Sequence, residues 1–377
     1  MDTPRPPGRG RPPRAIPLDG RIRQAYLTLA KQLVSAVHSV LGSTRDGSAR
    51  LPHATDAEPL KGGLRIGKAE EHGSDGDGQY HHYLTLWMFA LDRLALATGE
   101  RKYSELAVQL ARAVHPHFVV RRNGEAVRMV WKVSMDMGTA LVPSEGHLDA
   151  ATGFVVYRLL QRTAGRLQGV EGVLEGEIGD YRHLMSREGR LHASRDPLDL
   201  GMGLWMSHFF REEEWAATLG SQSLGMARAV LDEKNGLVSR DASRRLAFRE
   251  FGTCLGLECY GVDEGLKKSV DAVVDFWHHY LEDSTDEDLR PISLVMYAAA
   301  LIPGVDTLAV HDNLTIEAFL VDVSNPGEIA ANSGLRDLLE RILQAGATGM
   351  GLNLRIQSVP KLVPVFPPEI VQQTLWN

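Results

Sequence analysis

Apolar residues return every three or four positions along most of the chain, which is the spacing of one buried helix face. The clearest case begins at Gln79, and its apolar positions are Tyr80, Tyr83, Leu84, Trp87, Met88, Leu91, Leu94 and Ala95. This spacing predicts a helix that ends near Thr98 and Gly99, because glycine accommodates the left-handed conformation of a C-terminal cap.

A second amphipathic stretch follows at once, from Tyr103 to Phe118. Two helices joined by so short a connection run antiparallel and form a helical hairpin. The same periodicity predicts further helices at Ile22–Val40, Leu148–Thr163, Ile178–Met185, Leu198–Phe210, Trp215–Leu231, Arg244–Cys259, Glu264–Leu281, Asp286–Leu301 and Leu335–Ala345. The best strand candidate is RNGEAVRMVWKVSMDM, where Val127, Met129 and Trp131 alternate with Arg128 and Val130.

Consecutive hairpins favour an all-α fold, an (α/α)6 toroid or six-hairpin barrel with few short strands in its loops. In such a ring the loops at one end converge on a central funnel, so we expect a site made from helix entrances. An open solenoid is the alternative, but the sequence shows no fixed repeat period. We expect residues 1–19 to be a disordered Arg/Pro-rich lead, residues 20–345 one toroid domain, and residues 346–377 an irregular extension.

The composition is that of a soluble globular protein, with 377 residues of which 44% are hydrophobic and 24% charged. A formal charge of -7 argues against a general nucleic-acid binder. The chain has neither a membrane-length apolar run nor the apolar core of a secretory signal at its N-terminus, so we expect a cytoplasmic protein. Cys254 and Cys259 suggest neither a disulfide framework nor a zinc site.

Candidate chemistry first gathers at the entrance of the helix after Gln79. Asp77 precedes it, and Tyr80, His81 and Trp87 lie in its first turns. Asp77 is either a helix cap, favoured by the helix dipole, or a proton-transfer group that faces the funnel. In the second case Tyr80 and Trp87 would shape a sugar platform and His81 would supply a donor.

A second group surrounds the entrance of the helix at Leu148. It contains Trp131, Lys132, Asp136, Glu145 and His147. Asp136 and Glu145 fit no regular helix face, which makes them candidates for the site. In the same stretch, Ser144 is interpreted as an N-cap and Asp149 as a residue that stabilises the first turn.

Two further groups have a stronger structural interpretation. In Arg195-Asp196-Pro197-Leu198-Asp199, an aspartate before a proline is typical of an N-cap followed by the first helical residue. Arg249 and Glu250 are either a buried pair at the centre of the ring or part of a solvated face.

Several common signatures are missing from the sequence. It contains no P-loop, no G-x-S-x-G, no H-E-x-x-H and no G-x-G-x-x-G after a strand. We therefore expect no cofactor and no metal. A Mg²⁺-dependent diphosphate lyase remains a remote alternative, suggested by the acidic run from Asp283 to Asp288.

The segments GQYHHYLTLWMFALDRLALATGERKYSELAVQLARAVHPHF, RMVWKVSMDM, VPSEGHLDAATGFVVY, DPLDLGMG and RRLAFREFGTCLGL resemble the six-hairpin glycosidase-like proteins, in particular a microbial and fungal branch. The stretch from Trp87 to Leu91 with Thr98 and Gly99 is similar to the first hairpins of N-acylglucosamine 2-epimerase-type enzymes. The resemblance covers roughly Leu64 to Leu301 and implies an (α/α)6 toroid with a carbohydrate-type cleft. It transfers no catalytic pair.

These observations favour a carbohydrate-active enzyme, a glycoside hydrolase that uses carboxylate acid/base catalysis on a small-molecule or oligosaccharide substrate. Asp136 or Glu145 would protonate the leaving oxygen, and Asp77 would activate water or stabilise the developing positive charge. The alternatives are a sugar epimerase or isomerase that uses His81 or His147, and a non-catalytic glycan-binding or scaffold protein. The sequence does not indicate an oligomeric state.

Overall fold

The computed structural model describes residues 20–68, 70–73, 76–232, 236–286 and 289–301. The helices of this part are α1 (Gly20–Leu41), α2 (His81–Thr98), α3 (Arg101–Phe118), α4 (Asp149–Gln168), α5 (Glu175–Met185), α6 (Pro197–His208), α7 (Glu214–Val230), α8 (Ala247–Tyr260), α9 (Glu264–Ser284) and α10 (Arg290–Leu301). Short 3-10 turns cover Leu237–Ser239 and Ala242–Arg244. The strands are β1 (Gln79–Tyr80), β2 (Val119–Arg122), β3 (Glu125–Met129) and β4 (Lys132–Val133).

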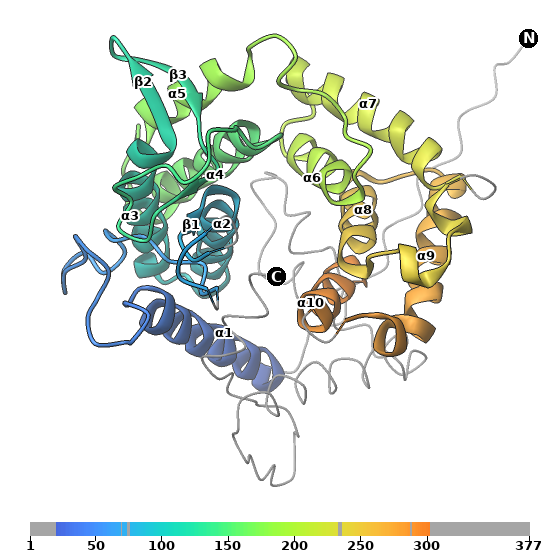
Figure 1. The fold of residues 1–377 in the computed structure, drawn as a ribbon, viewed down its shortest axis with the longest axis horizontal. Coiled ribbons are helices and arrows are strands. Elements are labelled where there is room, and N and C mark those ends of the chain that lie inside the picture. The colour runs from blue at the N-terminus through green and yellow to red at the C-terminus, as the bar shows by residue number, and fades with distance from the viewer. Residues whose placement is uncertain (1–19, 69, 74–75, 233–235, 287–288, 302–377) are drawn as a thin grey trace, which may run out of the picture.

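Inner and outer helices alternate around a ring (Figure 1). Helices α2, α4, α6, α8 and α10 follow one another on the inside, each in contact with the next. Helices α3, α5, α7 and α9 pack behind them on the outside. Because each outer helix returns the chain, successive inner helices start at the same end. The prediction of an all-α toroid is confirmed.

Most helix boundaries follow from the sequence pattern. Gly99 caps α2 in the left-handed conformation, with φ 71°, and its N–H donates to the Ala95 carbonyl, as predicted. Asp196 accepts hydrogen bonds from the N–H groups of Leu198 and Asp199, so the predicted N-cap with Pro197 at the first helical position is confirmed. The expected helix Leu335–Ala345, the N-terminal lead and the C-terminal extension lie outside the described residues.

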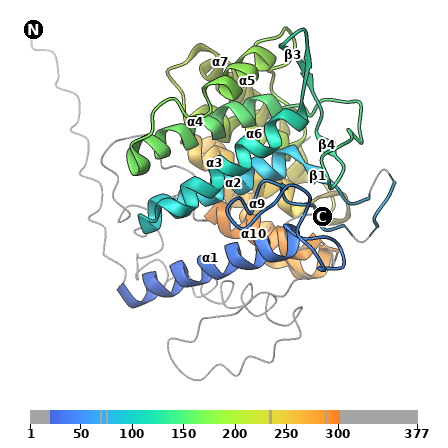
Figure 2. The same cartoon turned by 90° about the vertical axis from the view of Figure 1, so that its left-hand side faces the viewer.

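The predicted strand region forms two small antiparallel pairings. Strands β2 and β3 make a hairpin whose turn contains Asn123 and Gly124, both with positive φ. Strand β4 pairs with β1, so that Gln79 lies opposite Val133 and Tyr80 opposite Lys132. Figure 2 shows β1, β3 and β4 at one end of the helical assembly. This pairing joins the first two groups of candidate residues.

Two hydrophobic clusters fill the described part of the ring. One extends from α1 to α7, and the other joins residues of α6, α7, α8, α9 and α10. Helix α6 belongs to both clusters, since Trp205 and Met206 pack into the first, and Leu200 and Leu204 into the second. Helix α6 therefore lies where the two clusters meet.

Helices α6 and α8 approach each other through glycine. A Cβ atom at Gly201 would lie 1.9 Å from the carbonyl oxygen of Gly252, and one at Gly256 would lie 2.4 Å from the carbonyl oxygen of Gly201. Such distances are impossible for real side chains, so the backbones touch only because these positions lack one. In the part of the chain that the structure describes, no helix combines the length and hydropathy of a membrane-spanning segment.

We expect Gly201→Ala to destabilise the fold by about 1–3 kcal/mol, because the new methyl group meets rigid backbone rather than a movable side chain. Gly225→Ala in α7 is the matched control, since no atom lies within 4 Å of its added Cβ. That control should stabilise the helix by about 0.5–1 kcal/mol. Urea unfolding of both variants measures the difference, and equal midpoints would disprove the close contact.

Candidate functional site

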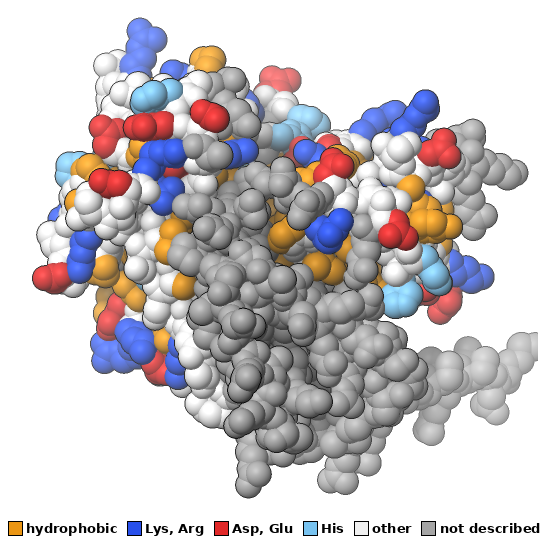
Figure 3. All heavy atoms as spheres, turned by 60° about the horizontal axis from the view of Figure 1, so that its bottom comes forward, with side chains coloured by type: hydrophobic (Ala, Val, Ile, Leu, Met, Phe, Trp, Pro, Cys, Tyr) orange, Lys and Arg blue, Asp and Glu red, His pale blue; other side chains and the backbone are white. Residues whose placement is uncertain are grey.

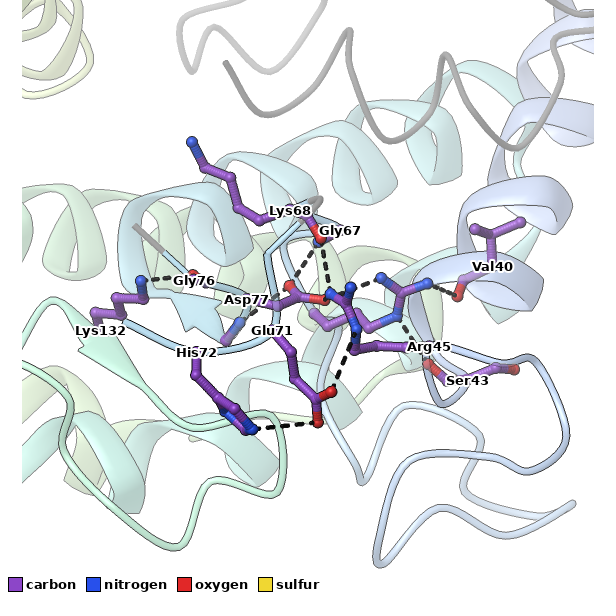
Figure 4. A network of polar contacts seen from close by, with 12 residues as sticks. Val40, Ser43, Arg45, Gly67, Lys68, Glu71, His72, Gly76, Asp77 and Lys132 are labelled. Carbon is purple, nitrogen blue, oxygen red and sulfur yellow. Dashed lines mark hydrogen bonds and ion pairs between the residues drawn. The ribbon is translucent and has the colours of Figure 1, made fainter. Parts of the chain in front are cut away.

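Asp77 lies in a buried ion-pair network (Figure 4). Its Oδ2 atom is 3.1 Å from Nη1 of Arg65 and 3.1 Å from Nη1 of Arg45. Its Oδ1 atom accepts hydrogen bonds from the N–H groups of Gly67, at 2.8 Å, and Gly78, at 3.0 Å. All four partners are donors, so both oxygens of this buried carboxylate already have partners within the protein.

The same network ties the end of α1 to the entrance of α2. Arg65 donates to the backbone carbonyls of Ser43, at 3.0 Å, and Val40, at 3.3 Å. The N-cap of α2 is Tyr80, so the interpretation of Asp77 as a helix cap is wrong. Its expected catalytic role stays a prediction, and the geometry is that of a structural carboxylate.

The expected sugar platform is largely internal. Tyr80 is buried and stacks on Tyr83 with ring centroids 5.0 Å apart, while Trp131 meets it edge-on at 5.1 Å. Lys132 is fully buried, with Nζ 5.1 Å from the centre of the Tyr80 ring and 2.6 Å from the Gly76 carbonyl oxygen. Trp131 is partly exposed, as is Tyr83.

The two candidate acids of the second group differ from each other. Asp136 is exposed and accepts hydrogen bonds from Ser134 Oγ and the Gly138 N–H, and the Ser134 bond is the main reason that its pKa is lowered. Glu145 is held by two arginines, Arg190 at 2.8 Å and Arg187 at 3.4 Å. Their expected roles stay predictions.

Two predictions, for Ser144 and for the pair of Arg249 and Glu250, need correction. The N-cap of α4 is Leu148, and Ser144 instead accepts a hydrogen bond from Trp131 Nε1 at 2.9 Å. Glu250 forms its ion pair with Arg245 rather than with Arg249, and also accepts from Trp277 Nε1 at 2.8 Å. Burial is the main reason that the pKa of Glu250 is raised.

Trp87 lies in the core, where its Nε1 donates to His38 Nε2 at 3.0 Å. Asp77, Asp136, Glu145 and Glu250 thus belong to four separate sets of contacts. We expected these acidic groups to face one shared site, and the described contacts instead give each its own partners.

A different group of side chains does converge, at the N-terminal ends of the inner helices α2, α4, α6 and α8. Nδ1 of His81, the first residue of α2, is 3.9 Å from Oδ1 of Asp149, the first residue of α4. Asp196, the N-cap of α6, accepts a hydrogen bond from Nη1 of Arg249 in α8 at 2.7 Å. Asp199, in the first turn of α6, interacts electrostatically with both carboxylates. We call His81, His147, Asp149, Asp196, Asp199 and Arg249 the entrance cluster.

Asp149 is the most perturbed acid of the entrance cluster. Its side chain is 9% exposed, and Oδ2 has no hydrogen-bond partner among the described residues. Burial, followed by the negative charge of Asp199, raises its pKa to about 7. Close to neutral pH this carboxyl group therefore both holds and releases a proton.

Asp199 has a more balanced environment. Burial and then the charge of Asp196 raise its pKa, whereas His147 and Arg249 oppose that shift. It is only partly buried. The two neighbouring carboxyl groups thus have different surroundings, which is the usual basis for dividing acid and base roles.

Two imidazoles complete the entrance cluster. His147 is partly exposed, and its Nε2 lies 3.1 Å from the carbonyl oxygen of His192. His81 is buried, with Nε2 2.7 Å from the hydroxyl of Tyr181. Burial, then the nearby His82 and His115, lower the pKa of His81 to about 3, so its ring is neutral.

Three predicted site residues, His81, His147 and Arg249, belong to the entrance cluster. Sequence reasoning placed Asp149, Asp196 and Asp199 at helix entrances but interpreted Asp149 and Asp196 as capping residues, and it overlooked Tyr181. The usable signal was that these acids occupy the first turns of alternate helices, which share one end of the ring.

Among the described residues, no group of three or more His, Cys, Asp or Glu side chains is arranged to hold a metal ion. A cavity of about 370 Å³ lies elsewhere, on the side of α3, between residues such as Lys61, Glu105 and Arg112. On the face shown in Figure 3, acidic and basic side chains are interspersed.

No protein-family model and no curated protein sequence matches the chain. Among solved structures, a polysaccharide lyase aligns over 92% of this chain and 95% of its own, with a TM-score of 0.46 and 10% identity. A likeness of this extent leaves substrate and reaction to be argued from the site itself. The resemblance to six-hairpin glycosidase-like proteins therefore stays a prediction beyond the helical fold.

We expect Asp77→Ala to destabilise the protein by about 3–5 kcal/mol, because it removes the carboxylate that neutralises the buried Arg65. Asp56→Ala is the matched control, since the Asp56 side chain that pairs with Arg50 is 98% exposed. Its loss should cost less than about 1 kcal/mol. Urea unfolding tests this, and an equally small effect at Asp77 would show that the network contributes little.

Asp149 should make stability depend on pH. Its raised pKa means that the folded state binds the proton more tightly than the unfolded state does, so stability falls as pH rises from about 4 to about 7. The full contribution is about 4 kcal/mol. The stability of Asp149→Asn minus that of the wild type should therefore be larger at pH 8 than at pH 4. Urea unfolding at both pH values checks this, and a constant difference would contradict it.

Proposed function

We propose that the protein is a carbohydrate-active enzyme, a glycoside hydrolase whose site is the entrance cluster. The single observation that carries the proposal is a buried carboxyl group, Asp149, with a pKa of about 7 beside a second carboxyl group, Asp199. In this proposal Asp149 is the general acid that protonates the leaving glycosidic oxygen. Asp199 is the carboxylate partner.

The roles follow from the surroundings of the two groups. A general acid works best when its pKa lies near the operating pH, a condition that burial creates for Asp149. Arg249 and His147 favour the ionised form of Asp199, as a base or nucleophile requires. Asp136 is poorly suited to the role of general acid, because its hydrogen bond with Ser134 lowers its pKa.

The rest of the entrance cluster suits a ligand with many hydroxyl groups. Arg249 supplies charged donors, His147 supplies a partly exposed imidazole, and Asp196 supplies an acceptor close to them. Sugars are recognised by such alternating donors and acceptors. Each lies in a helix or in the loop directly before one, which helps to fix their relative positions.

Two stereochemical courses are compatible with a pair of carboxyl groups. Asp199 acts as the base that removes a proton from the attacking water when the groups are about 6.5–9.5 Å apart. It acts as the nucleophile that forms a glycosyl-enzyme when they are about 5–5.5 Å apart. In both courses Asp149 gives its proton to the leaving oxygen. The anomeric form of the first product distinguishes the two.

A sugar epimerase or isomerase is the second candidate. The partly exposed imidazole of His147, with Asp199 among its charged neighbours, is the observation that favours it. Such an enzyme removes a carbon-bound proton, so solvent deuterium would enter the recovered sugar. Hydrolysis leaves carbon-bound hydrogen in place.

The test uses aryl glycosides of several sugars, each with a phenyl and a 2,4-dinitrophenyl leaving group. We expect Asp149→Asn to lower kcat about 10²–10⁴-fold on phenyl glycosides, because it removes the general acid. The loss should be much smaller on dinitrophenyl glycosides, which leave without protonation. Asp199→Asn should impair both.

Asp136→Asn is the control and should retain activity. Full activity of Asp149→Asn on phenyl glycosides would contradict the proposal. Deuterium in recovered free sugar would favour the epimerase, and glycan binding by calorimetry without any product would favour a non-catalytic protein.

A further inference from the structure

Two polar atoms on neighbouring side chains of the entrance cluster have no hydrogen-bond partner among the described residues. They are Nδ1 of His81 and Oδ2 of Asp149, both on side chains that are more than nine-tenths buried. Gly146 lies against the carboxyl group, since a Cβ atom there would be 2.1 Å from Oδ2. Buried polar atoms normally have hydrogen-bond partners, so these two atoms without a partner need an explanation.

We propose that His81 is a positioning residue for Asp149: the Tyr181 hydroxyl donates to Nε2, which leaves the ring proton on Nδ1, facing the Asp149 carboxylate. This inference rests on the proposed function only in treating Asp149 as the acid. His81 itself is buried and does not need to touch a substrate. The three residues come from α2, α4 and α5, so the fold rather than the local sequence assembles them.

We assign Tyr181 as the donor in this hydrogen bond from its length and surroundings. The distance from the Tyr181 oxygen to Nε2 is 2.7 Å, which is the usual length for an O–H donor and short for an N–H donor. Burial raises the pKa of Tyr181, so its hydroxyl keeps the proton that it donates. The neighbouring Tyr157 donates its own proton to the Ala111 carbonyl at 3.0 Å.

A neutral imidazole carries one proton, so an acceptor at Nε2 means a donor at Nδ1. Burial and the nearby His82 and His115 keep the ring neutral. Nδ1 is 3.9 Å from Oδ1 of Asp149, a separation that a small movement of the first turn of α4 would close. Catalytic hydrogen bonds are often this long before substrate binds.

In this arrangement His81 limits how far the pKa of Asp149 is raised. Burial and the charge of Asp199 favour its neutral form, and Tyr181 also contributes to its electrostatic surroundings. An N–H donor from His81 favours the ionised form. His81 therefore keeps the acid able to release its proton near neutral pH.

Two substitutions separate the two ring nitrogens. The amide of Asn occupies roughly the place of Nδ1, and the amide of Gln roughly that of Nε2. His81→Asn thus retains a donor toward Asp149, whereas His81→Gln retains contact with Tyr181 alone. Tyr181→Phe keeps the ring volume and removes the hydroxyl that fixes the tautomer.

The readout is the pKa of Asp149, measured without substrate by ¹³C NMR of the full-length protein with labelled aspartate. The Asp149→Asn variant assigns the signal. We expect His81→Gln to raise this pKa by roughly one unit, a tenfold change in the ionisation equilibrium. Tyr181→Phe should raise it by less, and His81→Asn should leave it within a few tenths of a unit.

Equal pKa values in the wild type, His81→Gln and Tyr181→Phe would overturn the inference. Equal increases in His81→Gln and His81→Asn would also overturn it, since they indicate packing alone. If His81→Gln does not fold, Tyr181→Phe decides. The measurement needs no turnover, so a shifted pKa without glycoside cleavage would reject the proposed function and retain the relationship between His81 and Asp149.

Discussion

Burial of the Asp149 carboxyl group beside a second carboxyl group is the interaction on which the chemistry of this structure depends. An ionised acid removed from water is costly, and a negative neighbour increases the cost. This cost is partly offset because Asp149 is the first residue of α4, where the helix dipole favours negative charge. The result is an acid poised near neutrality rather than one that is permanently ionised.

The contrast with Asp77 shows that burial alone does not create such a group. Both aspartates are buried near the entrance of an inner helix. Asp77 has two arginines and two backbone N–H groups as partners, whereas Asp149 has the distant imidazole of His81 and the charge of Asp199. The first arrangement stabilises charge and holds chain segments together. The second leaves a proton available for transfer.

The sequence predicts the helices of this fold much better than it predicts the site. Helix periodicity, Gly99 and the Asp196–Pro197 pair are local signals, so the described boundaries fall within a few residues of those expected. The partners of Asp77 and Asp149 are not local. Asp77 meets Arg65 across a loop, and Asp149 meets His81 from another hairpin. Before those contacts are known, an aspartate held by ion pairs and one with a raised pKa have the same sequence pattern.

The spacing of the acids is set by how closely the inner helices approach. Helix α6 carries Asp196 and Asp199 and packs on α8, which carries Arg249, through backbone contact at Gly201 and Gly252. Any larger residue there would push the two helices apart and carry these side chains with them. A displacement of about 1 Å in a reacting group can cost about 10²-fold in rate. If the entrance cluster is the active site as proposed, these glycines would therefore matter to activity although they carry no functional group.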